Sequence, residues 1–254
     1  MMERPKVGGT ALDACTRALL AKSYTIAALS GGCRCQIAAT SQLSNMKRRS
    51  TTCLLTACLL TTLSSCAADP VDAMWSIRMD STEDVNKPDR FELVPGGGIA
   101  VKGGGNATLW RPDVPMTAPY RLSIRVKATN LGLHPHGAGL VFGGNNVDND
   151  NQVYSYFLVR GDGQFLIKTR EGGDTTDICL WGEHPAIQRE GETDGIATNV
   201  LAVEVGDEAT RFLINGTQVH EATNTELHTN GSYGARLVHD LDVRFDEITI
   251  AAQD

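Results

Sequence analysis

Residues 153–170, VYSYFLVRGDGQFLIKTR, contain the strongest structural signal in the chain. Two runs rich in aromatic and β-branched residues are joined by Gly161-Asp162-Gly163, and this pattern predicts a β-hairpin because glycine supplies the positive φ values of a tight turn. Side chains alternate across a strand. The first arm therefore has one face with Val153, Ser155, Phe157 and Val159 and another with Tyr154, Tyr156, Leu158 and Arg160. Two strands alone are marginally stable in water, so we expect further strands to cover both faces.

Working outward from this hairpin, short strand-like runs alternate with clusters of Gly, Asn, Asp and Pro from Trp75 to the end of the chain. No convincing amphipathic helix interrupts them, and the pattern predicts an all-β protein made of two antiparallel sheets. Residues 242–251 change phase partway, which predicts a bulge near Asp246 or Glu247. Residues 120–128 alternate most clearly between apolar and polar side chains. Other strands are expected at residues 74–78, 90–94, 99–102, 107–110, 137–142, 177–181, 199–205, 211–214 and 217–221.

A region of about 180 residues is large enough for a single core, so residues 74–254 are predicted to form one domain.

Charge is unevenly distributed along the 254 residues. Residues 1–66 hold eight of the 23 Lys and Arg residues and two of the 30 Asp and Glu residues, which leaves 15 basic and 28 acidic groups, net −13, in the remainder. Nucleic-acid affinity comes largely from Lys and Arg that neutralise phosphates. The acidic balance therefore excludes nucleic acid as a partner.

The N-terminal part divides at Met46. Residues 46–66 have a secretory signal layout: Lys47-Arg48-Arg49, an apolar run over residues 51–63 that is too short to cross a bilayer, and small residues before Cys66. Residues 1–45 are interpreted as a mis-called start or a disordered extension, with an internal signal as the alternative, and residues 67–73 as a tether.

The end of this segment, Leu63-Ser64-Ser65-Cys66, resembles the lipobox of bacterial lipoproteins. The resemblance implies that Cys66 is lipidated and becomes the first mature residue, and two or more acyl chains anchor a protein stably to a membrane. It also implies a bacterial cell-envelope location. Because Ala67 and not Asp follows the cysteine, the expected location in a Gram-negative cell is the outer membrane. The alternative is a plain cleaved signal with a chance cysteine.

The order of the strand motifs resembles the concanavalin A-like lectin/glucanase jelly roll, and most closely its LamG-like and 3-keto-disaccharide hydrolase-like members. The matching features are Trp75, residues 91–94 and 96–101, GAGLVF at 137–142, residues 154–157 before Gly161-Asp162-Gly163, Trp181, NVL at 199–201, FLING at 212–216, GSYGAR at 231–236 and VRFD at 243–246. This resemblance implies an antiparallel two-sheet jelly-roll sandwich. The family contains both binders and hydrolases, so the fold leaves the function open.

The first functional hypothesis is a carbohydrate-binding domain, or one that binds another envelope ligand, with its site on the concave sheet. Aromatic rings would stack on a sugar and polar groups would bond its hydroxyls. The predicted ligand-binding residues are Tyr154, Tyr156, Arg160, Trp181 and His184. A core tryptophan and a rim arginine are the alternative interpretations of Trp181 and Arg160. A structural interaction module with no small ligand is a further possibility.

The second hypothesis is a glycoside-processing hydrolase. In it, His134 and His136 would act with an acidic group such as Glu183 or Asp150 in acid–base or metal-assisted catalysis. Two imidazoles in a polar loop with a proline turn are the alternative interpretation of the histidines. A retaining glucanase needs paired carboxylates on one strand, and Glu204-Val205-Gly206-Asp207-Glu208 does not fit that spacing.

No cofactor motif is present, but residues 145–151, NNVDNDN, could bind Ca²⁺ through the Asp148 and Asp150 carboxylates. The loop lacks the EF-hand glycine and terminal glutamate, and Asn and Asp are common in turns for local reasons. A polar turn without metal is therefore the alternative.

Overall fold

The computed structural model describes residues 23–26, 75–80, 90–94, 97–103, 105–130, 137–189, 192, 196–239 and 241–253. These residues form a nearly all-β structure with one short 3₁₀ turn, η4 (Asn224–Glu226). The strands in chain order are β1 (Ser23–Ile26), β2 (Trp75–Met79), β3 (Phe91–Val94), β4 (Gly98–Val101), β5 (Ala107–Met116), β6 (Tyr120–Asn130), β7 (Gly137–Asn145), β8 (Val153–Val159), β9 (Gln164–Glu171), β10 (Asp174–Glu183), β11 (Ala197–Val205), β12 (Ala209–Ile214), β13 (Thr217–Thr223), β14 (Gly231–Val238) and β15 (Asp242–Ala252).

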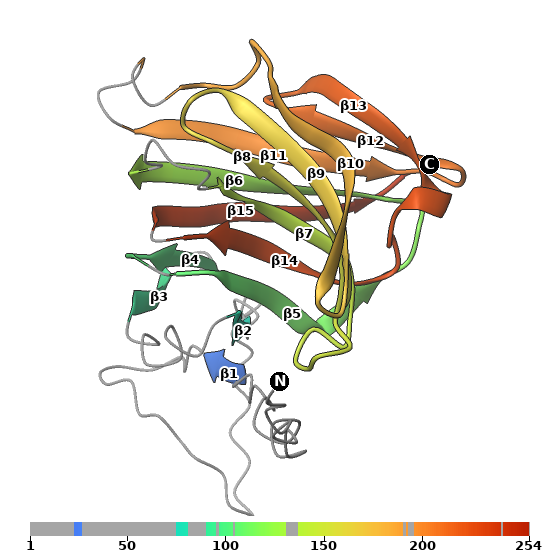
Figure 1. Cartoon of the computed structure of the whole chain (residues 1–254), viewed down its shortest axis with the longest axis horizontal. Helices are drawn as coiled ribbons and strands as arrows, with labels where there is room; N and C mark the ends of the chain where they lie inside the picture. The colour runs from blue at the N-terminus through green and yellow to red at the C-terminus, as the bar shows by residue number, and fades with distance from the viewer. Residues whose placement is uncertain are drawn as a thin grey trace, which may run out of the picture.

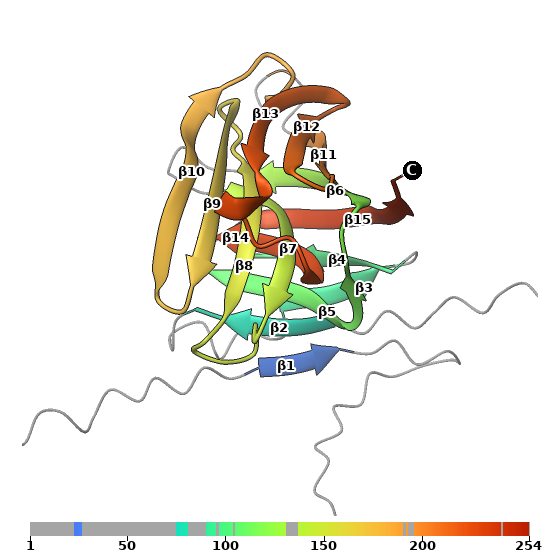
Figure 2. The ribbon, with the colours of Figure 1, turned by 90° about the vertical axis from the view of Figure 1, so that its right-hand side faces the viewer.

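The strands form two antiparallel sheets. The eight-stranded sheet has the order β1-β2-β5-β14-β7-β8-β9-β10, and the seven-stranded sheet has the order β13-β12-β11-β6-β15-β4-β3. Figure 1 shows the chain crossing repeatedly between the sheets, and the turned view in Figure 2 shows the two layers edge on. The predicted antiparallel two-sheet jelly-roll sandwich is therefore confirmed.

The main core lies between the two sheets. Its largest fully buried side chains include Trp75, Phe142, Phe157, Phe212 and Phe245, which come from both layers. Three of these rings pack edge to face, with Phe157 at 5.4 Å and Phe142 at 6.1 Å from Phe212 between ring centroids. Such aromatic pairs are favourable beyond the area they bury, so they help to hold β7 and β8 against β12.

The predicted hairpin forms between β8 and β9, with Val153 opposite Glu171 and Val159 opposite Phe165. Phe157 and Val159 belong to the main core between the sheets. Tyr154, Tyr156 and Leu158 belong to a second apolar cluster on the other face of the same sheet. The prediction that both faces of the hairpin are covered is confirmed.

The predicted bulge in the last strand is also confirmed. The pairing of β15 with β6 shifts between Asp246 and Thr249, so one residue more is accommodated on β15 than on β6. Val243 and Phe245 lie in the core before the shift, and Ile248 packs against the core after it. The bulge therefore lets apolar residues on both sides of it contact the core.

Within residues 74–254, β5 and β14 differ most from the sequence prediction. The strand expected at residues 107–110 continues to Met116 as β5, because the pairing with β14 jumps from Arg111 to Met116 and so accommodates Pro112 and Pro115 outside the ladder. Residues 231–238 form β14, a central strand that was not among the predicted strands, since its glycines and serine resemble a turn sequence.

Within residues 1–45, the stretch Ser23–Ile26 forms β1 and pairs antiparallel with β2, with Ser23 opposite Arg78 (Figure 1). Cys66, the rest of the predicted signal segment and the tether lie outside the described residues. Among the helices that the described ranges contain, none has the length and apolar character needed to cross a bilayer.

Candidate ligand-binding face

The outer face of the eight-stranded sheet carries polar and aromatic side chains in register. One row crosses the sheet through Arg78, Thr108, Arg236, Gly139 and Leu158, each opposite the next on the neighbouring strand. The adjacent row crosses through Ser76, Trp110, Gly234, Val141, Tyr156 and Lys168. The pairing register produces these rows, because side chains of residues that lie directly opposite each other on neighbouring strands point to the same face of the sheet.

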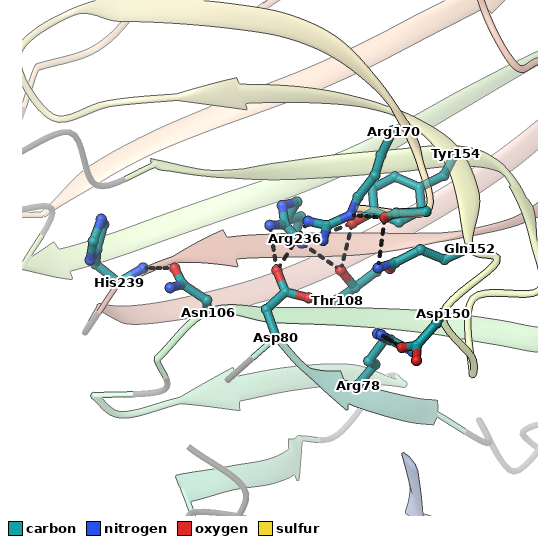
Figure 3. A network of polar contacts seen from close by, with 11 residues as sticks. Arg78, Asp80, Asn106, Thr108, Asp150, Gln152, Tyr154, Arg170, Arg236 and His239 are labelled. Atoms are coloured by element: carbon teal, nitrogen blue, oxygen red, sulfur yellow. Dashed lines mark hydrogen bonds and ion pairs between the residues drawn. The ribbon is translucent and has the colours of Figure 1, made fainter. Parts of the chain in front are cut away.

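Arg236 is at the centre of the first row and holds a hydrogen-bond network (Figure 3). Its Nη1 donates to the Thr108 hydroxyl at 2.7 Å and to the Tyr154 hydroxyl at 2.9 Å, and its Nη2 donates to Asp80 Oδ2 at 2.6 Å. Arg170 Nη1 lies 3.5 Å from the same Asp80 oxygen. The guanidinium is therefore fixed by groups from β5, from β8 and from the residue that follows β2.

Aromatic rings also contact Arg236. Its Cζ atom lies 5.3 Å from the centroid of Tyr156 and 5.9 Å from that of Tyr154, within the range of cation–π interactions. Burial acts to lower the pKa of Arg236, but Tyr154 and Asp80 more than offset this effect, and the pKa lies above its ordinary value. The side chain is therefore a permanent cation.

Arg78 extends this positive region along β2. Its side chain is 7% exposed, yet it pairs through Nη2 with Asp150 Oδ1 at 2.9 Å, whose side chain is 74% exposed in the loop between β7 and β8 (Figure 3). Four buried polar atoms on this face have no hydrogen-bond partner among the described residues: Arg78 Nε, Arg78 Nη1, Arg236 Nε and Asp80 Oδ1. Buried polar groups are nearly always bonded in native proteins, so these four atoms require partners such as ordered water.

A cleft of about 480 Å³ adjoins the network. The second row supplies its wall through Ser76 and Trp110, and the β7–β8 loop supplies Asn145, Asn146 and Asp148. Clefts of this size, with an aromatic wall and a few polar groups, are the usual form of small-molecule sites. The cleft lies on the same face as the arginine network, although none of the network residues lines it.

Two predicted ligand-binding residues belong to this site but do not face solvent. Tyr154 is fully buried and its hydroxyl bonds Arg236, while Tyr156 is 6% exposed beneath the same guanidinium. Burial raises the pKa of Tyr156, although Arg236 opposes that shift. Both tyrosines thus position Arg236.

The other predicted ligand-binding residues lie elsewhere. Arg160 stacks 4.7 Å above the centroid of Trp181 and pairs with Asp162, near the turn of the hairpin. His184 lies edge to face with Phe165 of the main core, at 6.3 Å between ring centroids, and its Nδ1 accepts a hydrogen bond from the Ala186 amide. Arg160 and Trp181 therefore form a stacked pair outside the Arg236 hydrogen-bond network, although Trp181 packs against the same apolar cluster as Tyr154 and Tyr156.

The candidate catalytic residues are not brought together by the described part of the chain. Glu183 is 3.1 Å from Arg189 in an ion pair. His134 and His136 lie outside the described residues. The acid–base set built on them therefore stays a prediction.

The predicted calcium ligands have other partners. Asp150 pairs with Arg78, and Asp148 accepts a hydrogen bond from the Asn149 amide at 3.0 Å. In the described ranges no three His, Cys, Asp or Glu side chains gather as they would around a metal ion. The calcium site stays a prediction.

Sequence reasoning missed Arg78, Asp80, Trp110, Arg170 and Arg236. Three of these positions carried a usable signal, and two of them, Arg78 and Asp80, alternate with the core residues Ile77 and Met79. Arg236 stands likewise between Ala235 and Leu237. A charged residue in an apolar, alternating run indicates a strand whose second face has a specific polar role.

No family model matches this chain, and no curated protein matches it. A carbohydrate-binding module from Bacillus subtilis is 14% identical, with 64% of this chain and 91% of that chain covered and a TM-score of 0.49. Sheep galectin-11 in complex with glycerol is 14% identical, with 54% and 93% covered and a TM-score of 0.40. An alginate lyase of polysaccharide lyase family 7 is 11% identical, with 65% and 84% covered and a TM-score of 0.45. Likeness at this level carries no functional argument, so the site must be judged from its own residues.

Proposed function

We propose that this protein is a carbohydrate-binding lipoprotein whose β-sandwich holds a saccharide on the outer face of the eight-stranded sheet. The observation that supports this proposal most directly is the cleft of about 480 Å³ that Trp110 lines together with Asn145, Asn146 and Asp148. A sugar presents apolar C–H faces and a ring of hydroxyl groups. An indole wall next to amide and carboxylate groups suits both features.

The proposal includes an anchor in the bacterial cell envelope through lipidated Cys66, in the outer membrane of a Gram-negative cell. Its support is the signal layout and the lipobox-like residues 63–66. A tethered domain would keep its ligand near the cell surface, because a protein carrying two or more acyl chains stays on the membrane.

Within the concanavalin A-like group, we propose a non-catalytic LamG-like role. The glycoside-processing alternative would need an acid–base pair in the cleft, and the described polar groups there are Asn145, Asn146, Asp148, Ser76 and Ser232. Asp148 is the single titratable group among them. This set favours binding over acid–base chemistry.

Calorimetric titration against a panel of neutral and acidic oligosaccharides would test the proposal. We expect at least one saccharide to bind, and Trp110→Phe and Asp148→Ala each to weaken its binding by about tenfold, which corresponds to the loss of one or two good contacts. Asp207→Ala is the matched control, since Asp207 is exposed in the turn between β11 and β12 on the other sheet. A panel in which nothing binds, or equal weakening by the control, would refute the proposed function.

A further inference from the structure

We infer that the saccharide bound on this face is acidic, with a ring carboxylate that takes the place of Asp150 at Arg78, and that Asp150 therefore competes with the ligand for Arg78. The inference rests on the proposed function and names the class of its ligand.

Among the residues that the structure describes, the ion-paired network carries one positive charge in excess. Arg78, Arg170 and Arg236 supply three positive charges, and Asp80 and Asp150 supply two negative charges. Lys168 and Asp177, farther along the same face, pair with each other at 2.7 Å and add no net charge. A buried excess charge is costly unless it is paired, so a single carboxylate would complete the network.

The unpartnered atoms fit a sugar acid better than a simple anion. Arg78 Nε, Arg78 Nη1 and Arg236 Nε are donors that lack partners among the described residues, and Asp80 Oδ1 is an acceptor that lacks one. All four atoms are closed off from solvent, so a ligand would approach this group only where the exposed Asp150 carboxylate moves away from Arg78. A carboxylate offers two acceptor oxygens, and each hydroxyl of a sugar ring offers a donor. Both complementary groups occur together on one uronic acid residue. Hydrogen bonds between a guanidinium and a carboxylate are charge-assisted and stronger than neutral ones.

Asp150 is the exchangeable member of the network. Its carboxylate is 74% exposed on a loop, and it contacts an arginine that is 7% exposed. By contrast, the side chain of Asp80 is only 13% exposed, and it pairs with both Arg236 and Arg170. A ligand carboxylate near Arg78 would therefore meet Asp150 as a like charge and a competitor, and loss of the Asp150 charge should strengthen binding.

The test uses the full chain in a nonionic detergent and calorimetric titration with tri-uronides of galacturonate, mannuronate, guluronate and glucuronate. Each acidic probe is compared with its fully methyl-esterified, neutral form. We expect an acidic probe to bind at least tenfold more tightly than its ester, and the difference to shrink as salt is raised. Arg78→Gln should weaken binding of the acid by at least tenfold, with partial recovery in Arg78→Lys, while Asp150→Asn should tighten it severalfold. Arg211→Gln, an exposed arginine of the seven-stranded sheet, is the matched control and should leave binding unchanged.

Arg78→Gln and Asp150→Asn are expected to change the affinity in opposite directions, and this separates ligand recognition from loss of structure. If the ion pair were purely structural, breaking it from either side would weaken binding. Asp150→Asn also covers the case in which Arg78→Gln fails to fold, since Asp150 is on the surface. Equal affinity for acids and esters, or weaker acid binding by Asp150→Asn, would overturn the inference and leave the proposed function intact. Absence of binding by acids, esters and neutral sugars alike would overturn both.

Discussion

Arg236 Nη2 donates a hydrogen bond to Asp80 Oδ2 at 2.6 Å across 156 residues of sequence. The contact joins the central strand β14 to the end of β2, near the edge of the sheet (Figure 3). Both side chains are nearly buried, so each depends on the other for compensation of its charge. The stability of the sandwich and the shape of its candidate site are therefore linked through this pair.

Asp80→Ala should lower the free energy of unfolding by about 3 kcal/mol, because it leaves a buried arginine without its carboxylate partner. Urea denaturation followed by circular dichroism would measure the change. Asp177→Ala is a suitable control, since it removes the more exposed partner of Lys168 on the same sheet and should cost about 1 kcal/mol or less. Equal losses in the two variants would contradict a special role for Asp80.

Gly234→Ala should destabilise the fold by about 3 kcal/mol or more, because the added Cβ would lie 1.8 Å from the carbonyl oxygen of Leu109 on β5. The backbone of two paired central strands would have to separate. Gly173→Ala, in the turn before β10, meets no atom within 4 Å and should change stability by less than about 1 kcal/mol. Thermal unfolding of the two variants would show the difference, and a Gly234→Ala protein as stable as the parent would mean that β5 and β14 are not packed this closely.

Tyr120 should make stability fall at alkaline pH. Burial raises the pKa of its phenol, which donates a hydrogen bond to the Thr229 carbonyl oxygen at 2.6 Å. Below pH 10 the phenol is protonated in both the folded and the unfolded state, and its contribution to the free energy of unfolding is fully present. Above pH 10 the unfolded chain loses this proton while the folded chain keeps it, so stability declines as pH rises. In Tyr120→Phe the decline between pH 10 and 11.5 should be shallower by up to about 1.4 kcal/mol per pH unit, measured by urea denaturation at each pH. An unchanged slope would show that this phenol ionises normally in the folded protein.

Cys66→Ala should release the protein from the membrane fraction of a bacterial host, because the acyl chains would have no attachment point. Mass spectrometry of the N-terminal peptide should find the acyl groups on Cys66 of the parent protein and none on the variant. Cys58→Ala lies inside the expected signal segment and should leave membrane association unchanged. An unacylated N-terminus in the parent, or a variant that remains in the membrane, would refute lipid anchoring at this cysteine.

The sequence alone determined the fold class, because the period of two along a strand is a local property. It placed Phe157 and Tyr156 on opposite faces of the central hairpin, and both assignments agree with the two apolar clusters. It also located the bulge of the last strand near Asp246, since a change of phase between Phe245 and Ile248 has no other simple explanation.

Only the tertiary structure decided which strands are central and which polar residues meet. β14 has the glycines of a turn, yet it lies between β5 and β7, where Gly234 permits close approach of the neighbouring backbone. Arg78, Asp80, Arg170 and Arg236 come from strands far apart in the chain, and the order and register of the sheet bring them together. Strand order depends on which long-range pairings bury the most apolar surface, and no local periodicity contains that information.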